Sequence, residues 1–106
     1  MKHQKVVVSP TAQAQYKKIC AYLIEKWSIN ASENFEKLTD QKIFQVSEFP
    51  KSCPESKSKK GVFKAVIEQH NSFYYRINQS VIEILIFVDN RIDPKAKAKQ
   101  LKKTKH

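Results

Sequence analysis

The stretch that decides the fold is Val81–Pro94, with the sequence VIEILIFVDNRIDP. Its apolar run, interrupted only at Glu83, predicts a strand over Val81–Asp89. Because the run is apolar at both alternating sets of positions, this strand should lie inside a sheet. The strand leads directly to Arg91 and other polar residues. A rigid strand that delivers an arginine at its end is a common way to position a functional side chain, so this exit is a candidate site.

Working outward, three more strands are expected. Two strands are expected over residues 62–69 and 73–78, which are rich in apolar and aromatic side chains and are followed by polar turn residues at 70–72 and 79–80. Near the start of the chain, Val6–Val8 is a β-branched run typical of a short strand. The sheet that joins these strands should be mainly antiparallel, because successive strands after residue 62 are separated only by short turns.

Two amphipathic helices lie between the first and second strands. Ser9 and Pro10 are typical of a helix start, and an apolar stripe follows at steps of three and four residues. This first stripe comprises Ala12, Tyr16, Ile19, Cys20, Leu23 and Trp27. A second helix is expected to be capped by Asn30 with Glu33 and to end before Pro50. Its stripe comprises Ala31, Phe35, Leu38, Val46 and Phe49.

The resulting order is β-α-α-β-β-β, which predicts an α+β fold with a helical hairpin packed on one face of a small, mainly antiparallel sheet. We expect one domain over residues 1–94, followed by a basic tail over residues 95–106. From Arg91 to the end of the chain, seven Lys and Arg residues against Asp93 give a charge of +6. This is most of the formal charge of +10 and favours an acidic protein or a nucleic acid as partner.

Composition excludes several classes of site. The single glycine, Gly61, excludes glycine-rich phosphate loops and dinucleotide fingerprints, which need several glycines. Cys20 and Cys53 form no CxxC or Cys/His cluster, so we expect neither a metal nor a cofactor. Cys20 lies on an apolar stripe, whereas Cys53 is expected to be an exposed thiol in a polar loop. No signal peptide or membrane-spanning run is recognisable, which predicts a cytoplasmic protein.

Four segments, in this order and spacing, carry a resemblance to a known family. They are VVVSPTAQAQYKKICAYLIEKW at 6–27, NASENFEKL to FQVSEFPKSCP at 30–54, KGVFKAVIEQHNSFYYRI at 60–77 and IEILIFVDNRIDP at 82–94. The chain resembles the RelE/ParE superfamily of bacterial type II toxin–antitoxin toxins, often labelled plasmid stabilisation proteins. The resemblance implies a growth-inhibiting toxin that a cognate antitoxin neutralises.

The resemblance leaves two activities open, because one fold can carry both. RelE-like members cut mRNA on the ribosome, whereas ParE-like members inhibit DNA gyrase. RelE-like nucleases commonly have a tyrosine or histidine shortly after the last strand, but here none follows Arg91 until His106. We therefore favour a ParE-like gyrase inhibitor that is not an enzyme. A RelE-like metal-free endoribonuclease is the first alternative, and a non-toxic basic nucleic-acid-binding module is the second.

RNA cleavage without a metal needs cations beside a group that exchanges protons. The candidate cations are Lys64, Arg76 and Arg91. The candidate proton-transfer groups are His70, Tyr74, Tyr75 and Glu68. Two structural alternatives stay open: Arg76 could instead form a salt bridge with Glu68 or Glu83, and His70 could be a solvated turn residue. Tyr74 and Tyr75 should point to opposite faces of the sheet, one into the core and one onto the open face.

Binding surfaces follow from exposure and charge. Arg76, Arg91, Lys95 and Lys97 are the expected target-binding residues. For the antitoxin, the resemblance implies a partner that docks an apolar stripe and adds a strand to a sheet edge. Phe44, Tyr22 and Ile24 lie off or at the margin of the core stripes, so they are the expected antitoxin contacts. The alternative for Phe44 is a partly exposed aromatic with no partner role.

Overall fold

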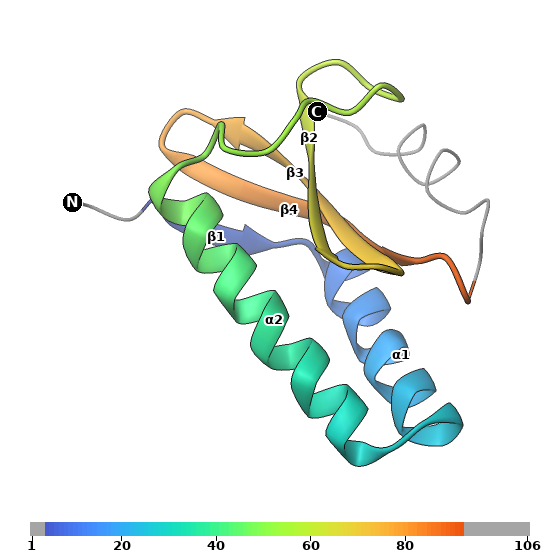
Figure 1. Ribbon diagram of the computed structural model, residues 1–106. Coiled ribbons are helices and arrows are strands. Elements are labelled where there is room, and N and C mark those ends of the chain that lie inside the picture. Colours follow the sequence, from blue (N-terminus) through green and yellow to red (C-terminus); the bar gives the residue numbers. More distant parts are fainter. Residues whose placement is uncertain (1–3, 93–106) are drawn as a thin grey trace.

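A four-stranded sheet carries two helices on one face, and the computed structural model describes residues 4–92 of the chain (Figure 1). The elements are β1 (Lys5–Val8), α1 (Pro10–Lys26), α2 (Ile29–Glu48), β2 (Val62–Glu68), β3 (Asn71–Asn78) and β4 (Val81–Asp89). The predicted α+β class and the order β-α-α-β-β-β are confirmed. Each strand prediction agrees with the observed bounds to within two residues. The predicted tail, 95–106, lies outside the described residues.

The predicted interior strand, β4, lies between β1 and β3 in the sheet order β1-β4-β3-β2. β2, β3 and β4 pair in antiparallel fashion, as their short turns require, whereas β1 is parallel to β4. The parallel pair places Val8 opposite Ile84, so the last five residues of β4 extend beyond the end of β1. That part of β4 therefore needs hydrogen-bond partners from another element.

The first helix supplies these partners. A bulge in the β3–β4 ladder leaves Leu85 between the paired residues Ile84 and Ile86, and the Leu85 carbonyl accepts a hydrogen bond of 2.8 Å from the Ser9 hydroxyl. Further along, the Phe87 amide donates to the side-chain oxygen of Gln15 at 2.9 Å. Both bonds come from α1 or its cap, so the helix completes the exposed edge of β4 and is fixed against it.

Local sequence sets both helix starts, although the second differs from the prediction. Ser9 caps α1 as expected, and its side chain accepts from the Ala12 amide at 3.0 Å. Ser28, not Asn30, caps α2 and accepts from the Ala31 amide at 3.0 Å. The Asn30 prediction is wrong because Asn30 already lies in the first turn of α2, where its backbone is helical.

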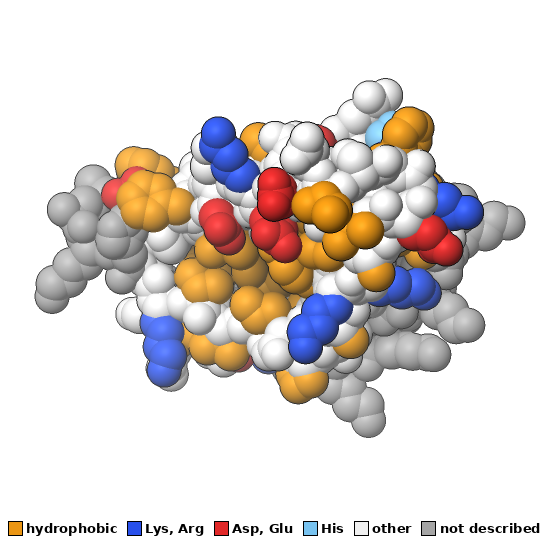
Figure 2. Space-filling view, turned by 90° about the horizontal axis from the view of Figure 1, so that it is seen from below, with side chains coloured by type: hydrophobic (Ala, Val, Ile, Leu, Met, Phe, Trp, Pro, Cys, Tyr) orange, Lys and Arg blue, Asp and Glu red, His pale blue; other side chains and the backbone are white. Residues whose placement is uncertain are grey.

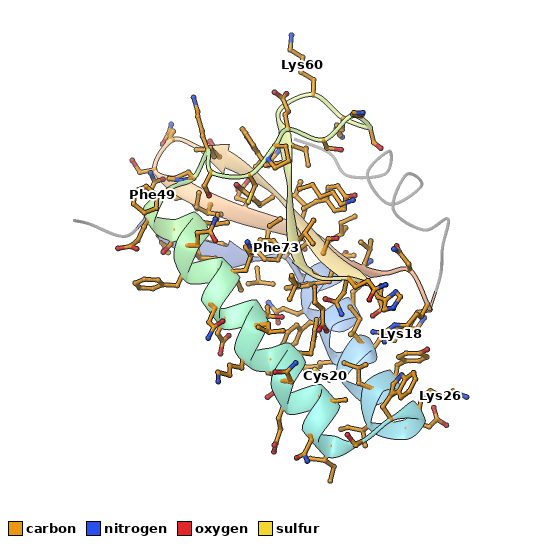
Figure 3. The ribbon with its side chains drawn as sticks, viewed as in Figure 1. Lys18, Cys20, Lys26, Phe49, Lys60 and Phe73 are labelled. Atoms are coloured by element: carbon orange, nitrogen blue, oxygen red, sulfur yellow. The ribbon has the colours of Figure 1, made fainter. Side chains whose placement is uncertain are left out.

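The core lies between the helical pair and the sheet, and aromatic rings connect the two layers (Figures 1 and 3). Phe87 of β4 lies 5.2 Å from Tyr16 of α1 and 5.5 Å from Phe73 of β3, measured between ring centroids. Tyr16 in turn lies 5.3 Å from Phe35 of α2. These offset ring contacts join both helices to both central strands.

Three predictions about burial are wrong. Trp27 and Phe49 were placed on the core stripes but are 65% and 51% exposed, because they are the residues after α1 and α2, where the helical period ends. Cys53 is buried in the core rather than exposed. The loop around Cys53 is held near the sheet, where the Lys64 amide donates to the Pro54 carbonyl at 2.9 Å.

The capping result gives a stability prediction. Ser28→Ala removes the side-chain acceptor at the start of α2 and should lower the free energy of unfolding by about 1 kcal/mol. Asn30→Ala is the matched control, since alanine is the better helix former there and should leave stability unchanged or slightly raised. Urea unfolding followed by circular dichroism measures both. A larger loss for Asn30→Ala than for Ser28→Ala would contradict the observed cap.

Candidate functional site

The exit of β4, predicted as a site from sequence, is an ion-paired cluster centred on Arg91. Its guanidinium donates to both carboxylate oxygens of Asp89, at 3.1 and 2.8 Å, and its backbone amide donates to the same carboxylate at 2.9 Å. The Asp89 side chain is fully buried, whereas that of Arg91 is 22% exposed. A bidentate pair with a buried carboxylate fixes the arginine in one orientation.

Asn71, the first residue of β3, extends the cluster to β2. Its side-chain amide donates to Asp89 at 3.3 Å and to Glu68 at 3.2 Å. Burial of the Asp89 carboxyl by itself would raise its pKa, but hydrogen bonds from Arg91 and Asn71 outweigh burial, and the pKa is lowered from its ordinary value. The hydrogen bond with Asp89 also raises the pKa of Arg91. Asp89 is therefore a permanent anion under the arginine at neutral pH.

The cluster also contacts the first helix. The Arg91 guanidinium lies over the Tyr22 ring, 5.6 Å from its centroid, which is a cation–π geometry. Tyr22, predicted as an antitoxin contact, is half-buried beneath Arg91, and its role as a contact stays a prediction. Arg91 thus links the end of β4 to α1, and the part of it that reaches solvent is held by contacts on both sides.

Arg76, the second predicted cation, lies on the sheet face opposite the helices. It pairs across strands with Glu83, and the two side chains form a salt bridge. Of the two alternatives for Arg76, the structural salt bridge with Glu83 is the one observed. Both side chains remain partly exposed, at 21% for Arg76 and 27% for Glu83, so the pair lies at the surface of the sheet.

The structure does not bring the two arginines together. Glu83, the partner of Arg76, and Asp89, the partner of Arg91, are six residues apart on β4. At about 3.3 Å per residue, this places the two ion pairs about 20 Å apart along the strand. A single scissile phosphate cannot contact both guanidinium groups at that separation.

The tyrosines predicted for proton transfer are both buried, at 1% exposure for Tyr74 and none for Tyr75. They do point to opposite faces, since Tyr75 belongs to the core beneath the helices and Tyr74 to a second apolar cluster with Val62 and Ile86. The expectation that one tyrosine would lie on an open face is wrong. The Tyr75 hydroxyl donates to the Pro50 carbonyl at 2.6 Å, and burial raises its pKa. Lys64 lies opposite Tyr74 in the β2–β3 ladder.

A cleft of about 460 Å³ lies between the end of the helical hairpin and the β4 exit. We call it the hairpin cleft. Its lining consists of Leu23, Trp27, Ser28, Ala31, Asn34, Glu68, His70 and Arg91. Thus His70 and Glu68, both predicted site residues, do meet Arg91 here. Sequence reasoning missed Trp27, because its spacing placed it on the core stripe; its position just before the second helix was the signal that the stripe had ended.

The other predicted contacts are scattered. Ile24 and Phe44, expected to bind the antitoxin, are 49% and 54% exposed. On the helical side, a groove between α1 and α2 is lined by residues that include Tyr16, Ile43 and the exposed Asp40. Figure 2 shows the molecule from below, with apolar side chains in a hollow beside carboxylates. Lys95 and Lys97 lie outside the described residues.

The ion pair between Arg91 and the buried Asp89 predicts how the stability of the fold depends on pH. The lowered pKa of Asp89 means that its ion pair stabilises the fold above the unfolded pKa of about 3.9 and is lost as the pH falls below about 4. Asp89→Asn should therefore lower the free energy of unfolding at pH 7 by about 3 kcal/mol and flatten the acid limb of the stability profile. Urea unfolding between pH 3 and pH 7, spanning both regimes, measures this effect.

Glu25→Gln is the control for Asp89→Asn, since it neutralises an exposed carboxylate on α1. It should change stability by less than about 0.5 kcal/mol. Equal effects of the two substitutions would mean that the Asp89–Arg91 pair does not hold the β4 exit.

Comparisons with solved structures agree on the fold. The chain is similar to a protein of the chromosomal ParDE toxin–antitoxin system from P. aeruginosa, with a TM-score of 0.71, 12% identity, and coverage of 82% of this chain and 96% of that one. It is also similar to a chain of the toxin–antitoxin complex RelBE2 from Mycobacterium tuberculosis, with a TM-score of 0.59, 15% identity and coverage of 83% and 99%. A mutant of the E. coli toxin RelE in the free state gives a TM-score of 0.61 at 9% identity, with coverage of 97% and 100%.

At these identities, the structural likenesses show the fold alone. No curated protein sequence gives a significant match. Among the described residues, no helix is both long enough and apolar enough to cross a bilayer. The family model described as the ParE toxin of the type II toxin–antitoxin system, parDE, matches residues 6–94. Apart from Lys5 at the start of β1, that range includes all six elements of the fold and the Asp89–Arg91 cluster, and the chain therefore belongs to the ParE toxin family of type II toxin–antitoxin systems.

Proposed function

We propose that this toxin inhibits DNA gyrase by binding it, in the manner of ParE, and that a cognate antitoxin neutralises it. Membership of the ParE toxin family supports the choice of gyrase over the ribosome. A toxin of this kind acts through a protein–protein contact, so it needs a rigid binding surface and no side chain that breaks a bond.

The observation that carries the proposal is the separation of the groups that RNA cleavage would need. A general base or acid must lie within hydrogen-bond reach of the reacting atoms, beside the cations that stabilise the phosphorane. Among residues 4–92, Arg76 and Arg91 lie at different ends of β4, and each is paired with a carboxylate. Tyr74 and Tyr75 are buried. Of the four predicted proton-transfer groups, His70 and Glu68 line a cleft with Arg91, and neither Arg76 nor Lys64 lines it.

Inhibition by binding requires these residues to present fixed donors to a partner rather than to transfer protons. Arg91 is held by Asp89 and Tyr22, so it can present a fixed donor to an acidic partner with little loss of side-chain entropy. We propose Arg91, with Lys95 and Lys97 after it, as target-facing residues. Arg76 offers a second, partly exposed cation on the other face of the sheet. Charged groups of this kind accelerate association and select the partner.

Binding of a cognate antitoxin is proposed from family membership and from exposed apolar side chains. The similar RelBE2 protein from M. tuberculosis was solved as a toxin–antitoxin complex. In this chain, Ile24 and Phe44 present large, exposed apolar side chains on the helical side. Docking of an apolar stripe from an antitoxin on such side chains would remove them from water, which is the main favourable term in protein association.

A functional assay separates the gyrase and ribosome proposals. Purified protein should block supercoiling of relaxed plasmid by gyrase at micromolar concentration and leave mRNA intact in a translating extract. The double variant His70→Ala, Tyr74→Phe removes two proton-transfer candidates and should retain growth arrest on expression. In a nuclease, loss of a general acid or base would slow cleavage by about 10²–10⁴-fold.

The outcomes that contradict the proposal are specific. Cleaved mRNA that becomes intact with the double variant, together with unaffected supercoiling, would assign the RelE-like activity instead. Harmless expression and salt-sensitive binding to any duplex would assign the nucleic-acid-binding alternative. Circular dichroism of the double variant serves as its folding control, because Tyr74 is buried and the substitution removes only a hydroxyl.

A further inference from the structure

Positive charge in the described part of the chain gathers in one loop. Residues 4–92 contain thirteen Lys and Arg and nine Asp and Glu, an excess of four positive charges. Five of these lysines and one of the glutamates, Glu55, lie within residues 51–64, which we call the lysine loop. The other eight basic and eight acidic residues cancel. The lysine loop therefore accounts for the whole charge excess of residues 4–92.

The lysine loop is a surface separate from the Arg91 cluster. It connects the end of α2 to β2 and includes the first three residues of that strand. Figure 1 shows it above the sheet, at the end of α2 that is far from the turn between the helices. Lys60 points outward from the loop and lies far from Lys18 and Lys26 of α1 (Figure 3). None of the residues that line the hairpin cleft belongs to the lysine loop.

Hydrogen bonds hold the loop in one conformation. The Lys64 amide donates to the Pro54 carbonyl at 2.9 Å, and Cys53 beside it is buried in the core. The Glu55 carboxylate accepts from the Gly61 amide at 2.6 Å, and Gly61 has a φ of 82°, a conformation that favours glycine. The single acidic side chain thus closes the loop onto its own backbone. The lysines are carried on a folded turn, which lowers the entropy lost when they bind a partner.

The exposed side chains of the loop indicate the chemistry of its partner. Lys51, Lys57 and Lys60 are exposed, and so are the hydroxyl-bearing Ser52 and Ser58. None of the large exposed apolar residues in the described chain lies within residues 51–64. A protein interface needs apolar anchors at its centre and is depleted in lysine, whereas a nucleic-acid interface is polar and basic. Lysine and serine both donate hydrogen bonds to phosphate oxygens, so the loop suits a phosphate backbone.

A duplex suits the loop better than a single strand. Single strands are bound largely by stacking of their bases on aromatic rings, but residues 51–62 contain no aromatic side chain. Phe63, the next residue, is half-buried and stacks on the Tyr75 ring with 5.4 Å between centroids. The loop also contains no arginine, the side chain best suited to bidentate contacts with guanine. Its lysines should therefore contact phosphates without reading the base sequence.

We propose that the lysine loop binds the phosphate backbone of duplex DNA, independently of base sequence. This contact is a second interaction surface of the toxin, and it does not depend on whether the toxin acts on gyrase or on mRNA.

The salt dependence of DNA binding tests the proposal. Anisotropy of a fluorescent duplex of about 20 base pairs measures the affinity of the full chain between about 50 and 200 mM salt. The triple variant Lys51→Gln, Lys57→Gln, Lys60→Gln should weaken binding more than about tenfold at the lowest salt. It should also reduce the slope of log affinity against log salt by about two to three, because each lost phosphate contact removes about one released counterion.

Two further variants separate position from charge. Lys18→Gln, Lys26→Gln, Lys37→Gln removes the same charge from exposed positions on the helices and should change the slope by less than about one. Arginine at positions 51, 57 and 60 keeps the charge and should retain affinity within about twofold. All variants keep residues 93–106 unchanged, so the contribution of those residues is the same throughout. Circular dichroism checks that each variant is folded.

Three results would overturn the proposal. An equal change of slope in the two glutamine triple variants would mean that only net charge attracts the DNA. Tighter binding to poly-glutamate than to the duplex at equal salt, lost in the loop variant, would assign the loop to an acidic protein. Affinities for two duplexes of unrelated sequence that differ by more than about tenfold would show that bases are read.

Discussion

The fold depends on how the second half of β4 is completed. β1 pairs with β4 only as far as Ile84, which leaves polar backbone atoms of a buried strand without a ladder partner on that side. Ser9 and Gln15 supply the missing partners from the start of α1, to the carbonyl of Leu85 and the amide of Phe87. An unpaired buried backbone group would cost about 1–3 kcal/mol, so these two side chains help to fix α1 against the sheet.

This constraint also positions the candidate site. Once α1 is held along β4, Tyr22 lies beside the strand exit, and Arg91 can contact it while bonding Asp89. Asn71 joins the same cluster from β3, and Glu68 from β2. Side chains from four elements therefore meet at one end of the sheet. A surface held by so many elements is rigid, which suits a toxin that acts by binding.

The pairing of each arginine with a carboxylate limits the reactions that these arginines can support. A guanidinium that already bonds a buried aspartate contributes a fixed dipole and donor, rather than a free cation able to neutralise a phosphorane. Family membership, the separated arginines and the buried tyrosines all favour recognition over bond cleavage. Exposed apolar side chains at the helical turn add the non-polar area that a protein contact needs.

The sequence by itself determined the elements and their order, because alternation, helical period and turn residues are local signals. The helix start at Ser9 and the strand over Val81–Asp89 follow from such signals alone. Ser28 and Trp27 were misjudged by a residue or two at a boundary, where local signals are weakest. Only the tertiary structure decided which partners meet. The parallel pairing of β1 with β4, the Arg76–Glu83 pair and the Asp89–Arg91–Tyr22 contacts join residues through the arrangement of whole elements. The spacing of these residues along the chain does not predict how close together they lie in the fold.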